Sequence, residues 1–580
     1  MALGLGLVMA LSVVACGGGT DEKGQADGSG QGSGMAEEGE AGADREPITL
    51  TFGVPYSDYG NGIHTDKNLF LQRLKEVTGV ELEFVIYDAD SYALMCAGGD
   101  LTDIILLTTN TPGSVEALIA SGGILPLDDL LDEYGQHIKA NIPDALEAVR
   151  DKENGDKIYG LPTNVSDAGS IPRRNADIGF RARYDIYKQI GSPEIRSQDD
   201  FLNVLKAMQD YERERTGEND IYCFGSFTDW GTWPYYICYP FMYGLMDTKT
   251  GFSYDRVTGE LVNNYTDGDS VYWDGMAFFN RAYQMGLFDP DGLMQKVAQY
   301  DDKVATGKYI ATIYSPGPLD PSLLGEEAVM TYLPGTAFPN VNETYAMAYP
   351  AGYQMEASRA ISASCPYPER AMQVLDYIDS PEGSRFLLNG VQGEDWDVVD
   401  GVPQLIGSMM DAYRNGTQNE YRRDRTGDAL CKGCMSSGNI VLDDGYPVDL
   451  TTGAEFISQT VNAAERAFAQ DFGSDLSYPG QVYEKWIEEG TVTDITTAEG
   501  ALKVASLGNL SEEASLISAE AEDYLASNIA KLIFASSDEE FQKEKDSMIA
   551  KFRELGFDMV EEEMIALFDA AHRDYEERVN

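Results

Sequence analysis

The hydrophobic pattern of residues 49–107 constrains the fold most strongly, because apolar residues there change period several times. Residues 49–54 alternate like a strand, 67–78 carry apolar side chains on one helical face, and 80–86 alternate again. After a further short helix, the run 103–107 is apolar at successive positions, which is typical of a parallel strand buried on both faces. This β-α-β-α-β order predicts an α/β fold with a parallel sheet.

The length of the chain allows either three or four ordinary domains or two large lobes. It has 580 residues, of which 43% are hydrophobic, so a sizeable core is easily buried. Residues 511–579 are dominated by helix formers with periodic Leu, Ile and Phe. We therefore expect a helical region at the end of the chain.

The first residues have the character of a processing signal. Residues 2–15 are uncharged and almost all apolar, which is too short for a membrane span of about 20 residues. They end in Val-Val-Ala before Cys16, which resembles a bacterial lipobox and predicts lipidation of Cys16 after cleavage. The usual basic segment is missing, so an ordinary cleaved signal without a lipid stays the alternative. Residues 17–46 are rich in Gly, Ser, Glu and Asp, as in a flexible tether.

The charge excludes some partners. Lys and Arg number 42 against 97 Asp and Glu, which gives a formal net charge of −55. The tether holds eight acidic and two basic residues, so most of this charge belongs to the folded part. Nucleic acids and anionic membrane surfaces need basic patches, so neither is expected as a partner.

Metal and thiol chemistry have weak support. The three histidines are far apart in sequence, which disfavours a zinc enzyme or a histidine-based triad. If Cys16 is lipidated, six cysteines remain, and their pairing cannot be read from the sequence. The Cys431–Cys434 pair has CxxC spacing but no second pair beside it, so a local disulfide or two thiols is the favoured interpretation.

Several short segments, in family order, resemble extracellular solute-binding lipoproteins of ABC importers, specifically the LplA-like oligosaccharide-binding group of family 1 type. Together they cover most of residues 48–580. They are 101–106 (LTDIIL), 123–128 (GILPLD), 156–162 (DKIYGLP), 183–191 (RYDIYKQIG), 389–396 (NGVQGEDW) and 552–557 (FRELGF).

The resemblance implies a two-lobe periplasmic-binding-protein-like α/β fold of type II, with a hinge between the lobes and a helical C-terminal region. The expected organisation follows the chain. It comprises a signal peptide (1–15), a lipidated tether (16–47), an N-terminal lobe (48–165, completed by about 300–350), a C-terminal lobe (166–299 with about 351–500) and a helical cap (501–580).

The implied function is capture of an oligosaccharide in the interlobe cleft and delivery to the transmembrane subunits of an ABC permease. Such a protein is a binding protein and not an enzyme, needs no cofactor, and is expected as a monomer anchored by lipid at the extracellular face of the bacterial membrane. Some alginate-binding relatives carry a calcium loop, and the corresponding stretch here is 212–220 (ERERTGEND). Two arginines among the would-be ligands argue against a metal there.

A sugar site needs aromatic planes for the C–H faces and planar polar groups for the hydroxyls. Gly231 and Pro234 interrupt the stretch 229–236, so its aromatic residues are expected on a loop or at the entry of a helix, where they can face the cleft. The candidates in the second half of the fold are Asp229, Trp230, Trp233, Trp273, Glu394 and Trp396. For each aromatic residue the alternative is core packing.

Ligands of open α/β sheets bind beyond the carboxyl ends of strands. Tyr59 and Asn61 follow the first predicted strand, and Asn164 follows the turn where the chain should first cross between lobes. Tyr314 ends another predicted strand, where we expect the chain to cross back between the lobes. All four are candidate ligand contacts.

The strongly acidic body predicts a neutral oligosaccharide, because it repels polyanions over a Debye length of about 8 Å. A local basic pocket supplied by Arg173, Arg174 or Arg181 would overturn that prediction. A receptor for a peptide or another small solute on the same fold is the main alternative. An extracellular glycoside hydrolase with two carboxylates is a weaker one, since no catalytic motif is recognisable.

Overall fold

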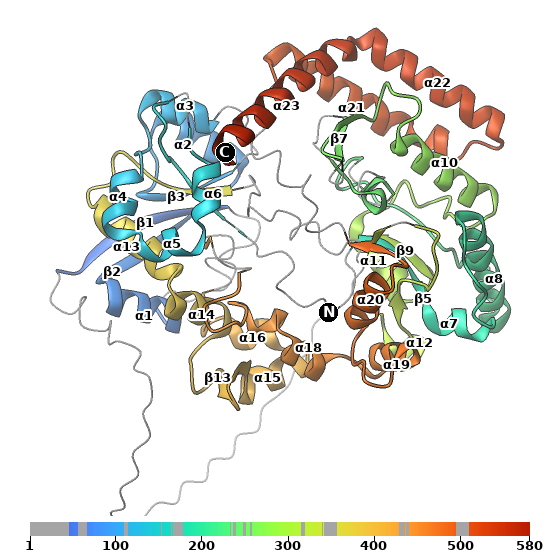
Figure 1. Cartoon of the computed structure of the whole chain (residues 1–580), viewed down its shortest axis with the longest axis horizontal. Helices are drawn as coiled ribbons and strands as arrows, with labels where there is room; N and C mark the ends of the chain where they lie inside the picture. Colours follow the sequence, from blue (N-terminus) through green and yellow to red (C-terminus); the bar gives the residue numbers. More distant parts are fainter. Residues whose placement is uncertain are drawn as a thin grey trace, which may run out of the picture.

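A computed structural model describes residues 46–55, 66–108, 114–151, 154–163, 165, 174, 178–232, 234–235, 239–247, 251–255, 258–314, 319–338, 340–341, 357–427, 435–436, 440–494 and 510–579. Figure 1 shows two α/β lobes side by side, joined by a linking region, with long C-terminal helices on the second lobe. Among the described residues, no helix combines the length and the apolar character needed to cross a bilayer.

The first lobe is built on a five-stranded sheet of order β2-β1-β3-β12-β4. β1 pairs in parallel with β2 and β3, while β12 runs antiparallel to β3 and β4. The strands are β1 (Ile48–Pro55), β2 (Val80–Tyr87), β3 (Ile104–Thr108), β4 (Leu161–Pro162) and β12 (Ala357–Ile361). The predicted parallel strands of 49–107 are therefore confirmed.

Helices cover both faces of this sheet. Ile104 and Leu106 of β3 belong to one buried cluster, and Ile105 and Leu107 belong to another on the opposite face. This two-sided burial explains the uninterrupted apolar run. The helices are α1 (Leu69–Thr78), α2 (Ala89–Gly98), α3 (Ser114–Ser121), α4 (Asp128–Tyr134), α5 (Gln136–Asn141), α6 (Pro143–Ala148), α13 (Pro368–Ile378) and α14 (Pro381–Asn389).

Local capping fixes the ends of α1, which packs on this sheet. The Asn68 side chain accepts a hydrogen bond from the Leu71 N–H at 3.1 Å, as an N-cap residue does. Gly79 ends the helix with φ 68°, a left-handed conformation that favours glycine. The chain then turns directly into β2.

The second lobe contains two three-stranded sheets, of order β10-β5-β9 and β6-β7-β8, and a short β11-β15 pair. Its strands are β5 (Ile178–Arg183), β6 (Leu245–Asp247), β7 (Phe252–Asp255), β8 (Leu261–Asn263), β9 (Ala311–Tyr314), β10 (Met330–Thr331), β11 (Asn340–Val341) and β15 (Thr493–Asp494). Its helices are α7 (Tyr184–Gln189), α8 (Gln198–Thr216), η1 (Pro240–Tyr243), α10 (Val271–Gln284), α11 (Val297–Ala305), α12 (Pro321–Leu324), α19 (Ala463–Phe472) and α20 (Pro479–Glu488).

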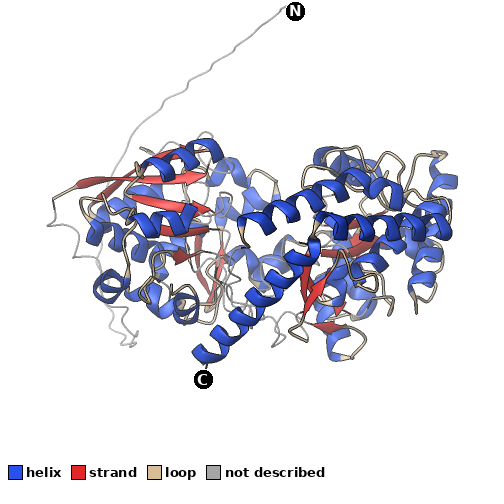
Figure 2. Ribbon diagram, turned by 90° about the horizontal axis from the view of Figure 1, so that it is seen from above, coloured by secondary structure: helices blue, strands red, loops and turns tan. Residues whose placement is uncertain are grey.

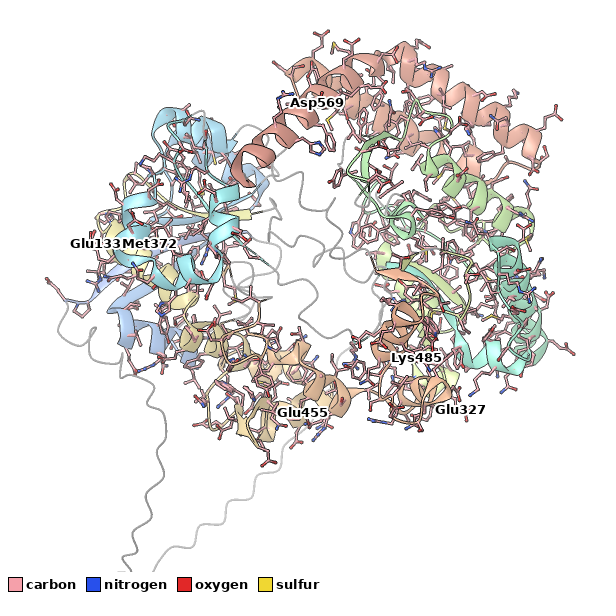
Figure 3. All side chains as sticks on the ribbon, in the orientation of Figure 1. Glu133, Glu327, Met372, Glu455, Lys485 and Asp569 are labelled. Carbon is pink, nitrogen blue, oxygen red and sulfur yellow. The ribbon has the colours of Figure 1, made fainter. Side chains whose placement is uncertain are left out.

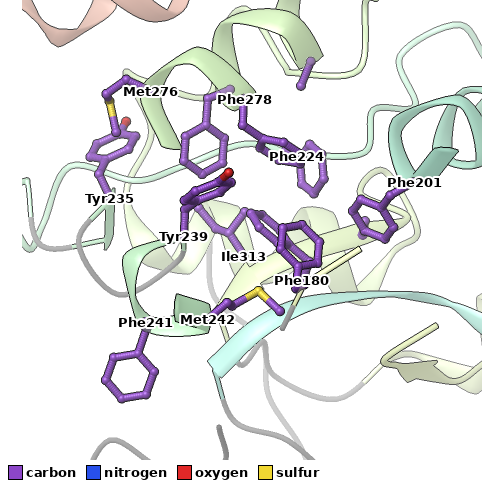
Figure 4. Packing of buried hydrophobic residues seen from close by; sticks show 14 of the residues in the cluster. Phe180, Phe201, Phe224, Tyr235, Tyr239, Phe241, Met242, Met276, Phe278 and Ile313 are labelled. Carbon is purple, nitrogen blue, oxygen red and sulfur yellow. The ribbon is translucent and has the colours of Figure 1, made fainter. Parts of the chain in front are cut away.

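Aromatic residues dominate the core of the second lobe. Phe180 of β5 lies with its ring centre 5.0 Å from that of Phe278 and 6.0 Å from that of Phe201 (Figure 4). The same buried cluster includes Leu525, Phe552 and other side chains from the C-terminal helices. These helices, α21 (Glu512–Ile533), α22 (Asp538–Leu555) and α23 (Phe557–Val579), therefore pack on the second lobe and confirm the predicted helical end of the chain.

The last helix leaves the second lobe and extends toward the first. Figure 2 shows it crossing the front of the molecule to the C-terminus.

A third region links the lobes and has a small core of its own. It contains β13 (Trp396–Val399), β14 (Val402–Leu405), α15 (Gly407–Arg414), α16 (Gln418–Arg422), η2 (Leu450–Thr452) and α18 (Ala454–Thr460). In Figure 3, Met372 marks the first lobe, Glu455 the linking region and Lys485 the second lobe.

The expected division of the chain between the lobes is wrong in its middle. β9 pairs with β5, so the segment around 311–314 belongs to the second lobe and not to the first. Conversely, β12 pairs with β3, and α13 and α14 pack on that sheet, which assigns 357–389 to the first lobe. The chain therefore crosses back between β11 and β12, later than predicted, and crosses again through the linking region.

Candidate functional site

The segment that contains Trp230 is held against the loop between α10 and α11 of the second lobe. Phe224 forms a bridge with Phe288, and the Thr228 N–H donates to the Gln295 carbonyl at 3.0 Å. The Trp230 ring packs edge-on against Phe227, with ring centres 4.9 Å apart, and Phe227 packs against Tyr300 of α11. Trp230 nevertheless stays 40% exposed.

Contacts on both sides fix this loop. The Asp229 carboxylate accepts a hydrogen bond from the Val297 N–H at 3.0 Å and pairs with Lys296 at 2.8 Å. On the other side, the Thr232 hydroxyl lies 3.1 Å from Glu522 of α21. A large aromatic side chain is thus presented to solvent from a restrained loop, which is what a stacking platform requires.

Asp229 has a different role from the predicted one. The Lys296 ammonium, followed by the Val297 N–H, holds the pKa of this carboxyl below its usual value. Its two oxygens are engaged at the start of α11. The carboxylate therefore positions the Trp230 loop, and the structure does not support it as an acceptor for ligand hydroxyls.

The prediction that Trp273 contacts the ligand is wrong, because this residue lies within α10 and is only 1% exposed. Its ring packs against Tyr272 and lies 5.9 Å from the Lys545 ammonium of α22. It belongs to the core between α10 and the C-terminal helices, so it does not face a ligand.

The prediction that Trp396 contacts the ligand is also wrong. It is 8% exposed, its indole N–H donates to the Gly390 carbonyl at 3.1 Å, and the Arg385 guanidinium covers its ring at 5.5 Å. An aromatic ring covered in this way cannot act as an open platform. Its packing with Met409 and Leu450 instead forms the core of the linking region.

Glu394 lies beside a buried polar network in the same region. Asp395 is fully buried and accepts hydrogen bonds from Arg425 at 2.8 Å and from the Tyr421 hydroxyl at 2.9 Å. Burial, followed by the Asp395 carboxylate, raises the pKa of Tyr421. Glu394 pairs with Arg425 at 2.6 Å, yet its side chain is 64% exposed. It therefore stays available to a ligand, whereas Asp395 is structural.

The other predicted contacts cannot be placed. Tyr59, Asn61, Asn164, Trp233 and the lipidation site Cys16 lie outside the described residues. Tyr314 ends β9 opposite Ile178 of β5, and only its backbone is described.

The acidic stretch 212–220 is occupied by internal cations. Glu212 pairs with Arg215 at 2.6 Å, and Lys308 reaches both Glu218 and Asp220 at 2.7 and 2.9 Å. Within the described ranges, no three His, Cys, Asp or Glu side chains are grouped as a metal site needs.

The sequence indicated Arg181 only as a possible basic group and did not indicate that it is buried in a strand. Arg181 lies in the middle of β5, is 5% exposed, and pairs in register with Thr312 of β9. The alternation of Phe180, Arg181, Ala182 and Arg183 could have indicated two arginines on one face of a strand.

An apolar hollow lies on the opposite face of β5. Phe180, Phe201, Met242, Phe338 and Trp486 are among its lining residues. It offers few of the polar groups that sugar hydroxyls need, so we do not assign it to ligand binding.

Comparison with known proteins gives a consistent result. The sequence profile of the family described as bacterial extracellular solute-binding protein matches residues 61–384. Lipoprotein LipO of Bacillus subtilis (strain 168) is 22% identical over 363 residues, which cover 58% of this chain and 66% of LipO. The fructooligosaccharide ABC transporter substrate-binding protein FusA of Streptococcus pneumoniae serotype 4 is 23% identical over 233 residues, 39% of this chain and 42% of FusA. The matched region spans less than two thirds of either relative.

Two solved structures share the fold. The HMO-binding, ABC-transporter-associated solute-binding protein from Bifidobacterium longum infantis ATCC 15697 superposes with a TM-score of 0.63 at 15% identity, over 91% of this chain and 99% of that one. FusA in complex with kestose gives a TM-score of 0.60 at 17% identity, over 91% and 100% of the two chains. At these identities the likeness concerns the fold alone, and it confirms the predicted two-lobed α/β architecture of type II.

Proposed function

The chain belongs to the bacterial extracellular solute-binding proteins, and we propose that it captures an oligosaccharide between its two lobes and delivers it to an ABC permease. Trp230 carries this proposal, since it is the one tryptophan of the described residues that is exposed, by 40%, and held by a restrained loop. The names of FusA and of the Bifidobacterium protein, which specify fructooligosaccharide and HMO, support a sugar as the ligand class.

The remaining site residues are part of the proposal. Trp233 follows Trp230 closely in sequence and is the second candidate platform. Tyr59, Asn61 and Asn164 of the first lobe, with Glu394 and Tyr314, are the candidate groups that meet the ligand from other sides. Closure of the two lobes around the ligand is a hinge motion of the kind known for binding proteins.

The location follows from the first residues. We propose that Cys16 carries a lipid and that residues 17–47 tether a monomeric body to the extracellular face of the membrane. The lipoprotein relative LipO supports this assignment. Such a tether keeps the binding protein at a high local concentration beside the permease in the same membrane.

Binding is proposed to occur without turnover. A purified sample mixed with a bound oligosaccharide should return it unchanged, while tryptophan fluorescence shifts. Shorter sugars appearing in proportion to the protein concentration would favour the glycoside hydrolase alternative, and stabilisation by peptides alone would favour the peptide receptor.

The Trp230→Ala and Trp273→Ala variants test the site as a matched pair. Removing the exposed Trp230 should weaken oligosaccharide binding by about 1–3 kcal/mol and leave the melting temperature nearly unchanged. Removing the core Trp273 should lower stability by about 3–5 kcal/mol and leave the affinity of the folded protein unchanged. Thermal-shift screening identifies the ligand, and calorimetry with melts measures both variants. If Trp230→Ala binds like the wild type, the proposed platform is wrong.

A further inference from the structure

Four arginines of the described residues are buried: Arg181, Arg183, Arg359 and Arg385. Three of them form ion pairs, with Asp185 at 2.6 Å, Asp379 at 2.7 Å and Asp444 at 2.6 Å respectively. Within the described part of the chain, Arg181 has no carboxylate within ion-pair distance. Its Nε and Nη2 atoms are buried there without a hydrogen-bond partner.

An unpaired buried guanidinium is costly, because arginine cannot lose its charge at physiological pH. Two carboxylates close in sequence to β5 or to the partners of β9 are already used: Asp185 binds Arg183, and Asp289 accepts from Lys303 and Tyr309, both at 2.6 Å. A buried polar group without a partner in a native structure calls for an explanation, and a group from outside that completes it is one such explanation.

The Nε and Nη2 atoms of two other arginines in this protein show which chemical group binds this edge of a guanidinium. Nε and Nη2 of Arg183 bind the two oxygens of Asp185 at 2.8 and 2.6 Å, and Arg215 binds Glu212 in the same way at 2.7 and 2.6 Å. This edge of the guanidinium is therefore matched to a carboxylate held by two parallel hydrogen bonds.

A second polar group adjoins Arg181. Thr312 stands opposite it in the β5–β9 register, so the two side chains lie on the same face of the sheet. Thr312 is fully buried, and its hydroxyl also has no partner among the described residues. A guanidinium edge and a hydroxyl together offer donors to both oxygens of one carboxylate.

This face belongs to the side of the lobe that carries Trp230. The chain of contacts runs from Trp230 to Phe227, from Phe227 to Tyr300, and from the Tyr300 hydroxyl to the Ile313 N–H at 3.3 Å, next to Thr312. In Figure 1, α11, which contains Tyr300, lies toward the first lobe, whereas α8 lies on the outer side.

We infer that Arg181, with Thr312, binds a single carboxylate of the solute, so that the ligand is an acidic oligosaccharide such as one carrying one uronate. This inference rests on the proposed function and specifies its ligand class. It replaces the neutral ligand predicted from the net charge of −55. That charge still disfavours polyanions, which is why one carboxylate fits better than several. Since the Nε–Nη2 edge is covered in this conformation, side chains must move to admit the ligand.

The test compares Arg181→Met with the matched control Arg183→Met, two positions along the same strand face. The probes are neutral oligosaccharides capped with one glucuronate, and the same set after reduction of the carboxyl to an alcohol. The wild type should bind a member of the acidic set, and Arg181→Met should lose about 10- to 150-fold in affinity for it, while its affinity for the reduced form stays within about twofold of wild type. Arg181→Lys, which keeps the charge without the fork, should recover part of the loss.

Melting of the proteins without ligand separates a binding role from a structural one. Arg181→Met should melt at or above the wild-type temperature because it removes an uncompensated buried charge, whereas Arg183→Met should melt lower. Wild-type affinity of Arg181→Met for the acidic probe, equal loss of both probes, or melting as low as Arg183→Met would overturn the inference. If the wild type binds only the reduced set, this inference fails and the proposed function stands. If it binds neither set nor any other oligosaccharide, both fail.

Discussion

Each lobe buries an arginine on a strand of its sheet, but the two arginines have opposite surroundings. In the first lobe, Arg359 of β12 pairs with Asp379, and both side chains are completely buried. In the second lobe, Arg181 of β5 is nearly as deeply buried and has no such partner in the described part of the chain. The difference distinguishes a charge that holds the fold together from a charge kept for something outside it.

The contacts of the first pair show what it holds. Asp379 accepts a hydrogen bond from the Ser436 N–H at 2.8 Å, and the Ser436 hydroxyl donates to the Pro162 carbonyl at 2.7 Å. The Ser436 carbonyl in turn accepts from the Val165 N–H at 2.8 Å. The ion pair therefore fastens the end of α13 and the linking region to the place where the chain first leaves the first lobe.

The largest expected effect concerns this pair. Arg359→Met leaves Asp379 buried without its cation and should lower the free energy of unfolding by about 3–5 kcal/mol. Chemical denaturation of purified protein measures this. The double variant Arg359→Met/Asp379→Asn removes both charges and keeps an acceptor for Ser436, so it should recover part of the loss. If the single variant is as stable as wild type, the contrast between the two arginines has no energetic meaning.

The elements of the first lobe could be predicted from the sequence because their signals are local. The strands and helices between residues 48 and 108 follow from hydrophobic period and from caps such as Asn68 and Gly79. The assignment of 300–389 to the lobes could not be predicted, because β9 to β12 have two to five residues each and pair with strands far away in sequence.

The candidate site was predictable only in part, for a similar reason. Exposure of Trp230 follows from a loop that Gly231 interrupts, which the sequence shows directly. Burial of Trp273 and Trp396 depends on tertiary packing, of Trp273 against the C-terminal helices and of Trp396 against Met409 and Leu450, which the local sequence does not show. Likewise, no sequence pattern indicates that Arg183 pairs with a carboxylate and that Arg181, in the described part of the chain, does not.

A substitution opposite Arg181 should make the second lobe resemble the first. Thr312→Asp places a carboxylate across the β5–β9 register from Arg181, at a distance that cross-strand neighbours can bridge. We expect the free energy of unfolding without ligand to be unchanged or raised by up to about 2 kcal/mol, and binding of an acidic oligosaccharide to be lost. Thr312→Val is the matched control, since it removes the hydroxyl without adding a charge. If Thr312→Asp destabilises the protein and Thr312→Val does not, Arg181 already has its charge balanced.

The smallest expected effect concerns an ion pair near the surface of the first lobe. Water solvates and screens these charges, so the pair contributes less to stability than the buried pair of Arg359. Arg150 lies 2.6 Å from Asp128, whose carboxylate also accepts from the Ile158 N–H at 3.2 Å. Burial alone would raise the pKa of Asp128, but the hydrogen bonds from Arg150 and Ile158 outweigh it and lower the pKa. The carboxylate form therefore stabilises the folded state above the unfolded pKa of about 4, and this contribution is lost as the pH falls through the lower folded value.

Asp128→Asn should cost less than about 1 kcal/mol at pH 7, and its difference from wild type should shrink at about pH 3. Melts at the two pH values measure this, and an equal difference at both would mean that Asp128 acts through its shape and hydrogen bonds and not through its charge.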